Sequence, residues 1–291
     1  MKPKIGAHLS VGKGLKATVD TAAQWGAEAC QMFARNPRGS AARQWTQDEI
    51  DAFTGGCQKN AIYPVVVHIP YIVNPAAERD DLYELAARIV VEDMIRCDLI
   101  GASYLVLHPG SRGAQSPEQA VERLIALIND AMARYDGDTV LLIETMAGMG
   151  KELGANPQEL EWIIGGIQER GRIGVCLDTC HLYAAGFDMA TPAGVDAAYE
   201  TLAQSVGRDA IRLVHVNDSK KELGSRVDRH APIGKGFIGL EGFQALMAHP
   251  FLGTLPMILE TPEETMQEDL NTLKALRDKQ LKTTKKSRKE S

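Results

Sequence analysis

The stretch "GVCLDTCHLYAAG", residues Gly174–Gly186, joins a short apolar run to two groups that can bind a metal ion. The run ends at Asp178, and His181 follows three positions later. Near-continuous apolarity over four to six residues is typical of a parallel strand that is buried on both faces. The stretch therefore predicts a strand that delivers a carboxylate, and then an imidazole, to the carboxyl end of a sheet.

Seven more apolar runs of this kind recur along the chain. Together the eight runs end at or beside His8, Phe33, His68, His108, Glu144, Asp178, His215 and Glu260. Helix-like segments lie between them, such as residues 116–135, where Ser116 is the expected N-cap. Eight alternations of strand and helix predict a single (β/α)8 TIM barrel, with an open doubly wound sheet as the alternative. In such a barrel the active site forms at the carboxyl ends of the strands.

Length and composition are those of one globular domain. The chain has 291 residues, 44% of them hydrophobic, and five scattered cysteines that fit a reducing compartment. No stretch reaches the roughly 20 apolar residues of a membrane helix, and the first residues lack the apolar core of a signal peptide. We therefore expect a cytoplasmic protein with no membrane partner. We expect the barrel in residues 1–278 and a basic, disordered tail in residues 279–291.

The charge balance argues at first against a nucleic-acid partner. The formal net charge is −6, and the last thirteen residues contribute +5 to it through six Lys or Arg and one Glu, which leaves −11 for the remainder. Phosphate binding usually requires a basic surface. A nucleic-acid function therefore needs a local source of positive charge that the sequence total does not reveal.

Nine imidazole and carboxylate groups at or near the strand ends offer such a source, because they can bind cations. They are His68, His108, Glu144, Asp178, His181, His215, Asp228, His230 and Glu260. One catalytic zinc takes about three protein ligands, so nine groups with bridging carboxylates can hold two or three ions. Mixed sets of this kind suit zinc, manganese or iron. Three divalent ions would add +6 to the four carboxylates of this set, and the resulting local +2 can attract a phosphate.

Four motifs carry a family resemblance. In chain order they are "LHPGS", "GVCLDTCHLYAAGFD", "HVNDSK" and "GSRVDRHAPIGKGFIG". Together they resemble the endonuclease IV family of apurinic/apyrimidinic endonucleases (AP endonuclease family 2), and the match runs over nearly the whole chain. The resemblance implies a monomeric, zinc-dependent TIM barrel of base excision repair. It implies hydrolysis of the phosphodiester 5′ to an abasic site in duplex DNA, leaving a 3′-hydroxyl and a 5′-deoxyribose phosphate, with 3′-end trimming as an accompanying activity.

The resemblance also assigns the nine groups to three zinc ions per chain, with manganese or iron as alternatives at some sites. It implies that His68 and His108 hold the first ion and share Glu144 with the second. It further implies that a metal-bound hydroxide between these two ions is the nucleophile, with Glu144 and Glu260 as the catalytic carboxylates. The remaining assignments are Asp178, His215 and Glu260 to the second ion, and His181, Asp228 and His230 to the third.

Two loop residues match positions that the family uses near the lesion. Arg38 lies in "ARNPRGS" and Tyr71 in "HIPYIVN". An arginine and an aromatic ring suit insertion into a base stack. The alternative for Arg38 is a solvated loop charge, and for Tyr71 a packing residue at the barrel rim.

Two rival functions fit parts of the same pattern. A sugar isomerase or epimerase on a related barrel also gathers histidines and acids, but it needs fewer ligands. A catalytically inactive DNA-binding barrel is the other rival. The glycines of "IGKGFIG", Gly234, Gly236 and Gly239, follow a charged loop and not a strand, so we expect a backbone approach to DNA or a plain turn, and no dinucleotide site.

Overall fold

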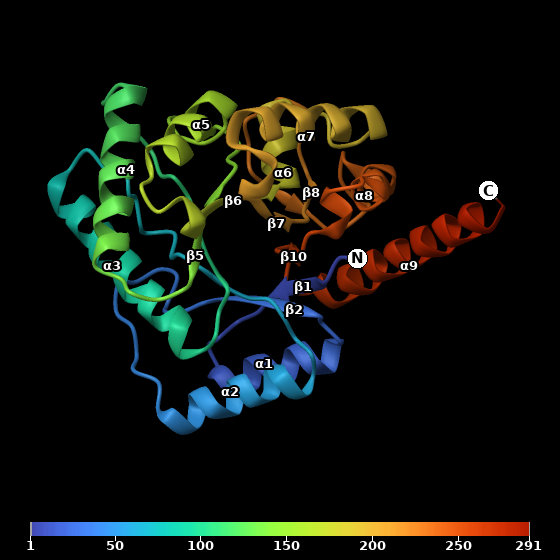
Figure 1. Ribbon diagram of the computed structural model, residues 1–291, viewed down its shortest axis with the longest axis horizontal. Coiled ribbons are helices and arrows are strands. Elements are labelled where there is room, and N and C mark those ends of the chain that lie inside the picture. Colours follow the sequence, from blue (N-terminus) through green and yellow to red (C-terminus); the bar gives the residue numbers. More distant parts are fainter. Residues whose placement is uncertain (1, 291) are drawn as a thin grey trace.

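Parallel strands close into a barrel in the computed structural model, which describes residues 2–290 apart from the side chains of residues 283–290. The strand order within the described residues is β1-β10-β7-β6-β5-β4-β3-β2. Ile5 pairs with Met257, which joins the first strand to the last and excludes the open sheet. The predicted (β/α)8 barrel is confirmed (Figure 1). The barrel strands are β1 (Ile5–His8), β2 (Ala29–Phe33), β3 (Val65–His68), β4 (Tyr104–Leu107), β5 (Val140–Glu144), β6 (Ile173–Asp178), β7 (Ile211–His215) and β10 (Met257–Leu259).

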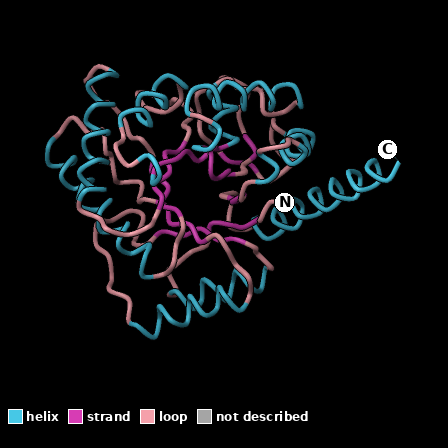
Figure 2. Tube along the Cα trace, viewed as in Figure 1, coloured by secondary structure: helices cyan, strands magenta, loops and turns pink. Residues whose placement is uncertain are grey.

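Helices surround the ring of strands on the outside (Figure 2). They are α1 (Leu15–Trp25), α2 (Gln47–Lys59), α3 (Asp80–Leu99), α4 (Pro117–Ala133), α5 (Pro157–Gly166), α6 (Thr179–Ala185), α7 (Pro192–Val206), α8 (Gly239–Ala248) and α9 (Met266–Glu290). Short 3-10 turns lie at Arg170–Arg172, Arg208–Ala210 and Leu252–Thr254. A small antiparallel hairpin pairs β8 (Asp218–Ser219) with β9 (His230–Ala231) beyond the end of β7.

Local sequence signals set the helix starts. Ser116 caps α4 as expected: its side chain accepts from the backbone N–H of Gln119, and the Gln119 side chain accepts from the backbone of Ser116. The same capping box, with Thr46 and Glu49, starts α2, which we did not predict. These reciprocal bonds satisfy amide donors that the first helical turn otherwise leaves unpaired.

The barrel interior is built in two layers. The apolar layer takes one residue from each of seven strands: Ala29, Val66, Val106, Leu142, Cys176, Leu213 and Ile258. Residues two apart on a strand face the same side, so the next inward position toward the carboxyl end follows each of these by two. We call the resulting set the polar layer, together with His8, which stands two after Gly6 on β1. Its members are His8, Gln31, His68, His108, Glu144, Asp178, His215 and Glu260.

The basic segment 279–291 is only partly described. α9 begins against the barrel, where Leu270 and Leu273 are buried, and then runs away from it (Figure 1). Ser291 and the side chains of residues 283–290 lie outside the described residues, so the predicted disordered tail and the boundary at residue 278 stay predictions. Between residues 2 and 290, no helix combines the length and apolarity that crossing a bilayer requires.

Gly6 provides a test of barrel closure. A Cβ at this position would lie 2.1 Å from the carbonyl oxygen of Ala29, so a side chain would force β1 away from β2. We expect Gly6→Ala to lower the free energy of unfolding by roughly 1–3 kcal/mol, as overpacked cores do. Urea denaturation measures this effect. The matched control is Gly165→Ala in α5, where nothing lies within 4 Å, and it should be neutral or stabilising. Equal effects of the two changes would contradict the packing argument.

Candidate metal centre

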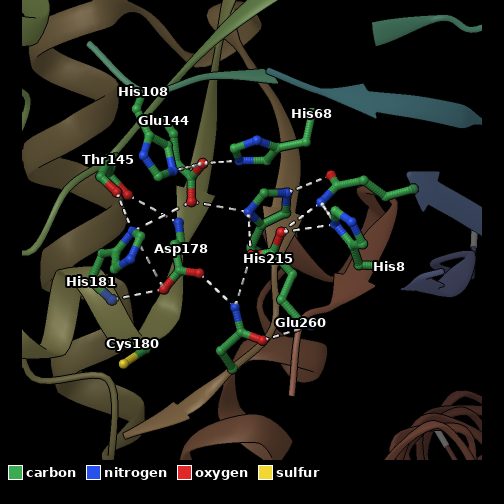
Figure 3. A network of polar contacts seen from close by, with 12 residues as sticks. His8, His68, His108, Glu144, Thr145, Asp178, Cys180, His181, His215 and Glu260 are labelled. Atoms are coloured by element: carbon green, nitrogen blue, oxygen red, sulfur yellow. Dashed lines mark hydrogen bonds and ion pairs between the residues drawn. The ribbon is translucent and has the colours of Figure 1, made fainter. Parts of the chain in front are cut away.

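The nine predicted ligands lie together at the carboxyl end of the barrel, which we call the mouth. Six belong to the polar layer and come from β3, β4, β5, β6, β7 and β10 or the residues that follow them. His181 comes from the first turn of α6, and Asp228 and His230 come from β9 and the loop before it. Figure 3 shows the side chains of these six residues, His68, His108, Glu144, Asp178, His215 and Glu260, pointing toward one another. Residues as far apart in the sequence as His68 and Glu260 therefore contribute to one site.

Glu144 stands between two groups of ligand atoms. Its Oε2 lies 3.1 Å from His68 Nε2 and 3.2 Å from His108 Nε2. Its Oε1 lies 3.1 Å from His215 Nδ1, which in turn lies 3.1 Å from Glu260 Oε2. The two carboxylate oxygens thus face different partners, which is the arrangement of a bridging ligand.

A third group lies beside the second. Asp228 contacts His181 Nε2 at 3.3 Å through Oδ2 and His230 Nε2 at 3.1 Å through Oδ1. Asp178 lies within reach of both the second and the third group. Cys180 also lies near Asp228 and His230, but burial raises the pKa of its thiol to about 12 and so disfavours the thiolate that a metal needs.

The hydrogen bonds of the histidines fix which ring nitrogen remains free. Nδ1 donates to a backbone carbonyl in His68 (Ile69, 2.7 Å), His181 (Thr145, 2.8 Å) and His230 (Glu260, 3.0 Å). A carbonyl oxygen can only accept, so the proton is on Nδ1 and the lone pair of Nε2 faces the ligand groups. This outer shell of acceptors is typical of metal-binding histidines.

Two of these nitrogens lie close to carboxylate oxygens without a well-aligned hydrogen bond. Nε2 of His181 and Nε2 of His230 are buried, and oxygens of Asp228 lie 3.3 and 3.1 Å away, but no described side chain gives either nitrogen a bond of good geometry. A buried polar atom without a well-aligned partner is costly unless something outside the protein satisfies it. Together with the carboxylate oxygens beside them, these nitrogens form a donor set that fits divalent transition-metal ions.

Protonated histidines balance the buried carboxylates when no ion is bound. Burial raises the pKa of Glu144, but the nearby His215 and His108 outweigh burial and hold it well below its usual range. Burial lowers the pKa of His230, yet the neighbouring carboxylates of Asp228 and Asp178 raise it to about 9. Because four carboxylates lie close together at the mouth, positive charge is required there both with and without bound metal ions.

Asp178 has a second function that the sequence did not reveal. It caps α6, because its Oδ1 accepts from the backbone N–H of His181 at 2.7 Å, so His181 lies in a helix and not in a simple turn. Its Oδ2 accepts from Asn217 Nδ2 at 2.6 Å, and Asn217 Oδ1 accepts from the backbone N–H of Glu260 at 2.8 Å. Asn217 therefore ties two ligands together, and we did not predict it.

Tyr71 and Arg38 occupy different parts of the rim. The Tyr71 side chain is 66% exposed, and its ring centroid lies 5.2 Å from that of Phe33 and 6.3 Å from that of His108. A cavity of about 880 Å³ above the mouth has Tyr71 in its wall. Arg38 is exposed on the loop between β2 and α2 and does not line this cavity.

The glycines of "IGKGFIG" surround a carboxylate of the protein itself. The backbone N–H groups of Gly234 and Gly236 donate to Asp218 Oδ2 at 2.9 and 3.0 Å, and that of Gly239 donates to Oδ1 at 3.4 Å. Asp218 lies in β8, which pairs with the β9 residue His230 through Ser219. The glycine loop therefore braces the hairpin that carries a candidate ligand.

Known proteins share this barrel and its sequence. The family model described as a xylose isomerase-like TIM barrel matches residues 19–277. The probable endonuclease 4 of Moorella thermoacetica is 42% identical over 266 residues, which is 91% of this chain and 95% of that protein. The corresponding protein of Chloroflexus aggregans is 40% identical over 94% of this chain and 97% of its own length. The chain belongs to the endonuclease IV family.

Solved structures agree with this assignment. The crystal structure of endonuclease IV from Thermus thermophilus has a TM-score of 0.84 and 35% identity, covering 95% of this chain and all of that one. A D-tagatose 3-epimerase-like protein also matches, with a TM-score of 0.73 at 18% identity, which shows the shared fold alone. The chain is thus a nuclease, and the predicted resemblance is confirmed.

Metal binding should release protons. Below pH 9 the metal-free His230 holds a proton that an incoming ion must displace. We expect the apparent zinc affinity to rise with pH between pH 7 and about pH 9. Calorimetry in two buffers of different ionisation enthalpy counts the protons released at pH 7, and His230→Asn should release fewer. A zinc affinity that is constant between pH 7 and pH 9 would contradict the prediction.

Proposed function

We propose that this nuclease acts in base excision repair, where it hydrolyses the phosphodiester on the 5′ side of an abasic site in duplex DNA. The products are a 3′-hydroxyl and a 5′-deoxyribose phosphate, and trimming of blocked 3′ ends is a secondary activity. We further propose that it works as a cytoplasmic monomer. The observation that carries the proposal is the position of Glu144, whose two oxygens face two separate groups of histidines.

Three zinc ions per chain account for all nine ligands, with manganese or iron as alternatives at some sites. Clustered divalent ions supply an activated water, neutralise phosphoryl charge and stabilise the leaving oxygen. The proposed ligands of the first ion are His68, His108 and Glu144; of the second, Glu144, Asp178, His215 and Glu260; of the third, His181, Asp228 and His230.

The candidate ligands differ in how far they are exposed to the cavity. His108 and Asp228, with side chains 28% and 36% exposed, border the open cavity where a phosphate would arrive. Glu144 and His215 are fully buried beneath the cavity, where Glu144 contacts His68 and His215 contacts Glu260. Buried ligands with fixed hydrogen bonds keep the geometry constant, so little reorganisation is needed when the substrate enters.

The third group of ligands favours the nuclease over a sugar epimerase or isomerase. A sugar site with one or two ions has no need of Asp228 and His230. These two residues are positioned by the β8–β9 hairpin, which is held in place by hydrogen bonds from the glycine loop to Asp218. A third ion adds positive charge at the side of the cavity, which suits a polyanionic substrate more than a neutral sugar. All nine ligands are present, which also argues against an inactive barrel.

The rim residues support recognition of the lesion. The exposed Tyr71 ring rests against Phe33 and His68, so it is supported while one side stays open to the solvent. Arg38 lies on a loop whose base is held by Arg35, which donates to the buried Asp93 at 2.6 and 2.9 Å. We propose that Tyr71 and Arg38 enter the duplex beside the missing base, where stacking and positive charge are both favourable.

Substitution of the bridging ligand tests the catalytic proposal. Glu144→Gln keeps the shape of the side chain but removes the charge, so two ions lose a shared ligand. We expect cleavage of a duplex with one abasic site to fall by more than the roughly 100-fold that loss of an outer-shell partner costs. The exposed Glu161→Gln is the control and should cleave normally. Normal turnover by a folded Glu144→Gln protein would overturn the assignment.

Separate alanine variants test lesion recognition. Tyr71→Ala and Arg38→Ala should weaken binding to an abasic duplex, for Tyr71 by about 1–3 kcal/mol if the ring stacks on a base. Binding to an intact duplex should change little, because no gap is open to the ring. Tyr63→Ala is the matched control, since Tyr63 is 64% exposed at the opposite end of the barrel. Equal losses on both duplexes would show that neither residue senses the lesion. Fluorescence anisotropy measures all of these affinities.

A further inference from the structure

One position of the polar layer is occupied by neither a histidine nor an acid. Gln31 on β2 lies two residues after Ala29 of the apolar layer and so faces the mouth with the ligands. It is completely buried. A buried amide needs partners for both its oxygen and its nitrogen, and the partners of the Gln31 amide belong to the polar layer.

The amide of Gln31 contacts three members of that layer. Its Nε2 lies 2.6 Å from Glu260 Oε1 and 2.9 Å from His8 Nδ1. Its Oε1 lies 2.8 Å from His215 Nε2. The side chain therefore connects two candidate ligands of the second ion, which are 45 residues apart in the chain and lie at the ends of the neighbouring strands β7 and β10.

The direction of each hydrogen bond follows from Glu260. An ionised carboxylate can only accept, so the nitrogen of the Gln31 amide must face Glu260, and its oxygen must face His215. That oxygen can only accept in turn, so Nε2 of His215 carries a proton. The lone pair of a neutral His215 is thus on Nδ1, which lies 3.1 Å from oxygens of both Glu144 and Glu260.

His215 differs in this respect from three other histidines of the site. His68, His181 and His230 each donate to a backbone carbonyl, which no substitution removes. His215 donates to a side chain. An apolar residue at position 31 would leave its Nε2–H unpaired and would also free Glu260 from its shortest hydrogen bond.

We propose that Gln31 is a positioning residue for the second ion: it fixes the tautomer of His215 and the orientation of Glu260, and so sets the affinity of that site. The inference rests on the proposed function for the three zinc ions and for the assignment of His215 and Glu260 to the second of them. Gln31 is not one of the nine candidate ligands and does not line the cavity above the mouth. Its expected effect is the 10–100-fold change in metal affinity that is typical when the supporting partner of a ligand is lost.

The test compares Gln31→Met with the unaltered protein by chelator competition, after loading with zinc alone. Methionine fills similar space, but it cannot donate to Glu260, and its thioether sulfur is only a weak acceptor for His215. We expect one of the three zinc ions to bind 10–100-fold more weakly in Gln31→Met and the other two to bind as before. The matched control is Met32→Leu, which changes the next residue of β2 on the outward face and should alter no zinc affinity.

A second measurement separates positioning from a general loss of stability. Zinc should raise the melting temperature of the unaltered protein. Gln31→Met should lower the metal-free melting temperature, because His215 and Glu260 each lose a hydrogen bond, and it should also make the zinc-dependent rise above that metal-free value smaller than in the unaltered protein or in Met32→Leu. Parallel losses with and without zinc, or unchanged affinity at every site, would overturn the role of Gln31 and leave the proposed function intact. If the unaltered protein binds no zinc, the proposed function and this inference fall together.

Discussion

The mouth of the barrel depends on the burial of an ionised carboxylate. Glu144 is completely buried, and removing such a charge from water costs several kcal/mol unless partners compensate it. Histidines from β3, β7 and the end of β4 supply the partners in the metal-free protein, and in the proposed active form cations would take over. An imidazole suits both states, because it can carry a proton or offer a lone pair. Histidines therefore surround Glu144, because they can compensate its charge without metal ions and can bind those ions when they are present.

Much of the barrel could be predicted because each strand carries its own signal. "VLLIE" and "VVVH" are apolar until their last residue, and the structure places those last residues, Glu144 and His68, at the mouth. Helix α6 was missed because Asp178 looks like the end of a strand and gives no sign that it also caps a helix. Helix α2 was missed although Thr46 and Glu49 spell a capping box. A capping box marks only a helix start, and it is a weaker signal than an apolar run that spans a whole strand.

The supporting amides could not be found from the sequence. Gln31 lies inside "ACQMF", a run that reads as an ordinary strand with one polar residue, and Asn217 lies two residues past β7. Their importance comes from contacts with Glu260, which is more than 40 residues from Asn217 and more than 200 from Gln31. Counting two residues from the apolar layer would have pointed to Gln31, but that layer is defined only once the strands are in register. The ligand assignments to particular ions likewise came from family resemblance and not from spacing.

The pairing of β1 with β10 has a consequence for how the protein is made. Met257 follows its partner Ile5 by 252 residues, so β1 leaves the ribosome long before the strand that it pairs with. Until β10 is made, β1 has an unpaired edge, and such an edge can pair with strands of other nascent chains. Glu260, three residues beyond Met257, arrives in the same final step. Closure of the ring and completion of the site thus coincide, so a nascent chain that has not yet reached Glu260 cannot assemble the full set of candidate ligands.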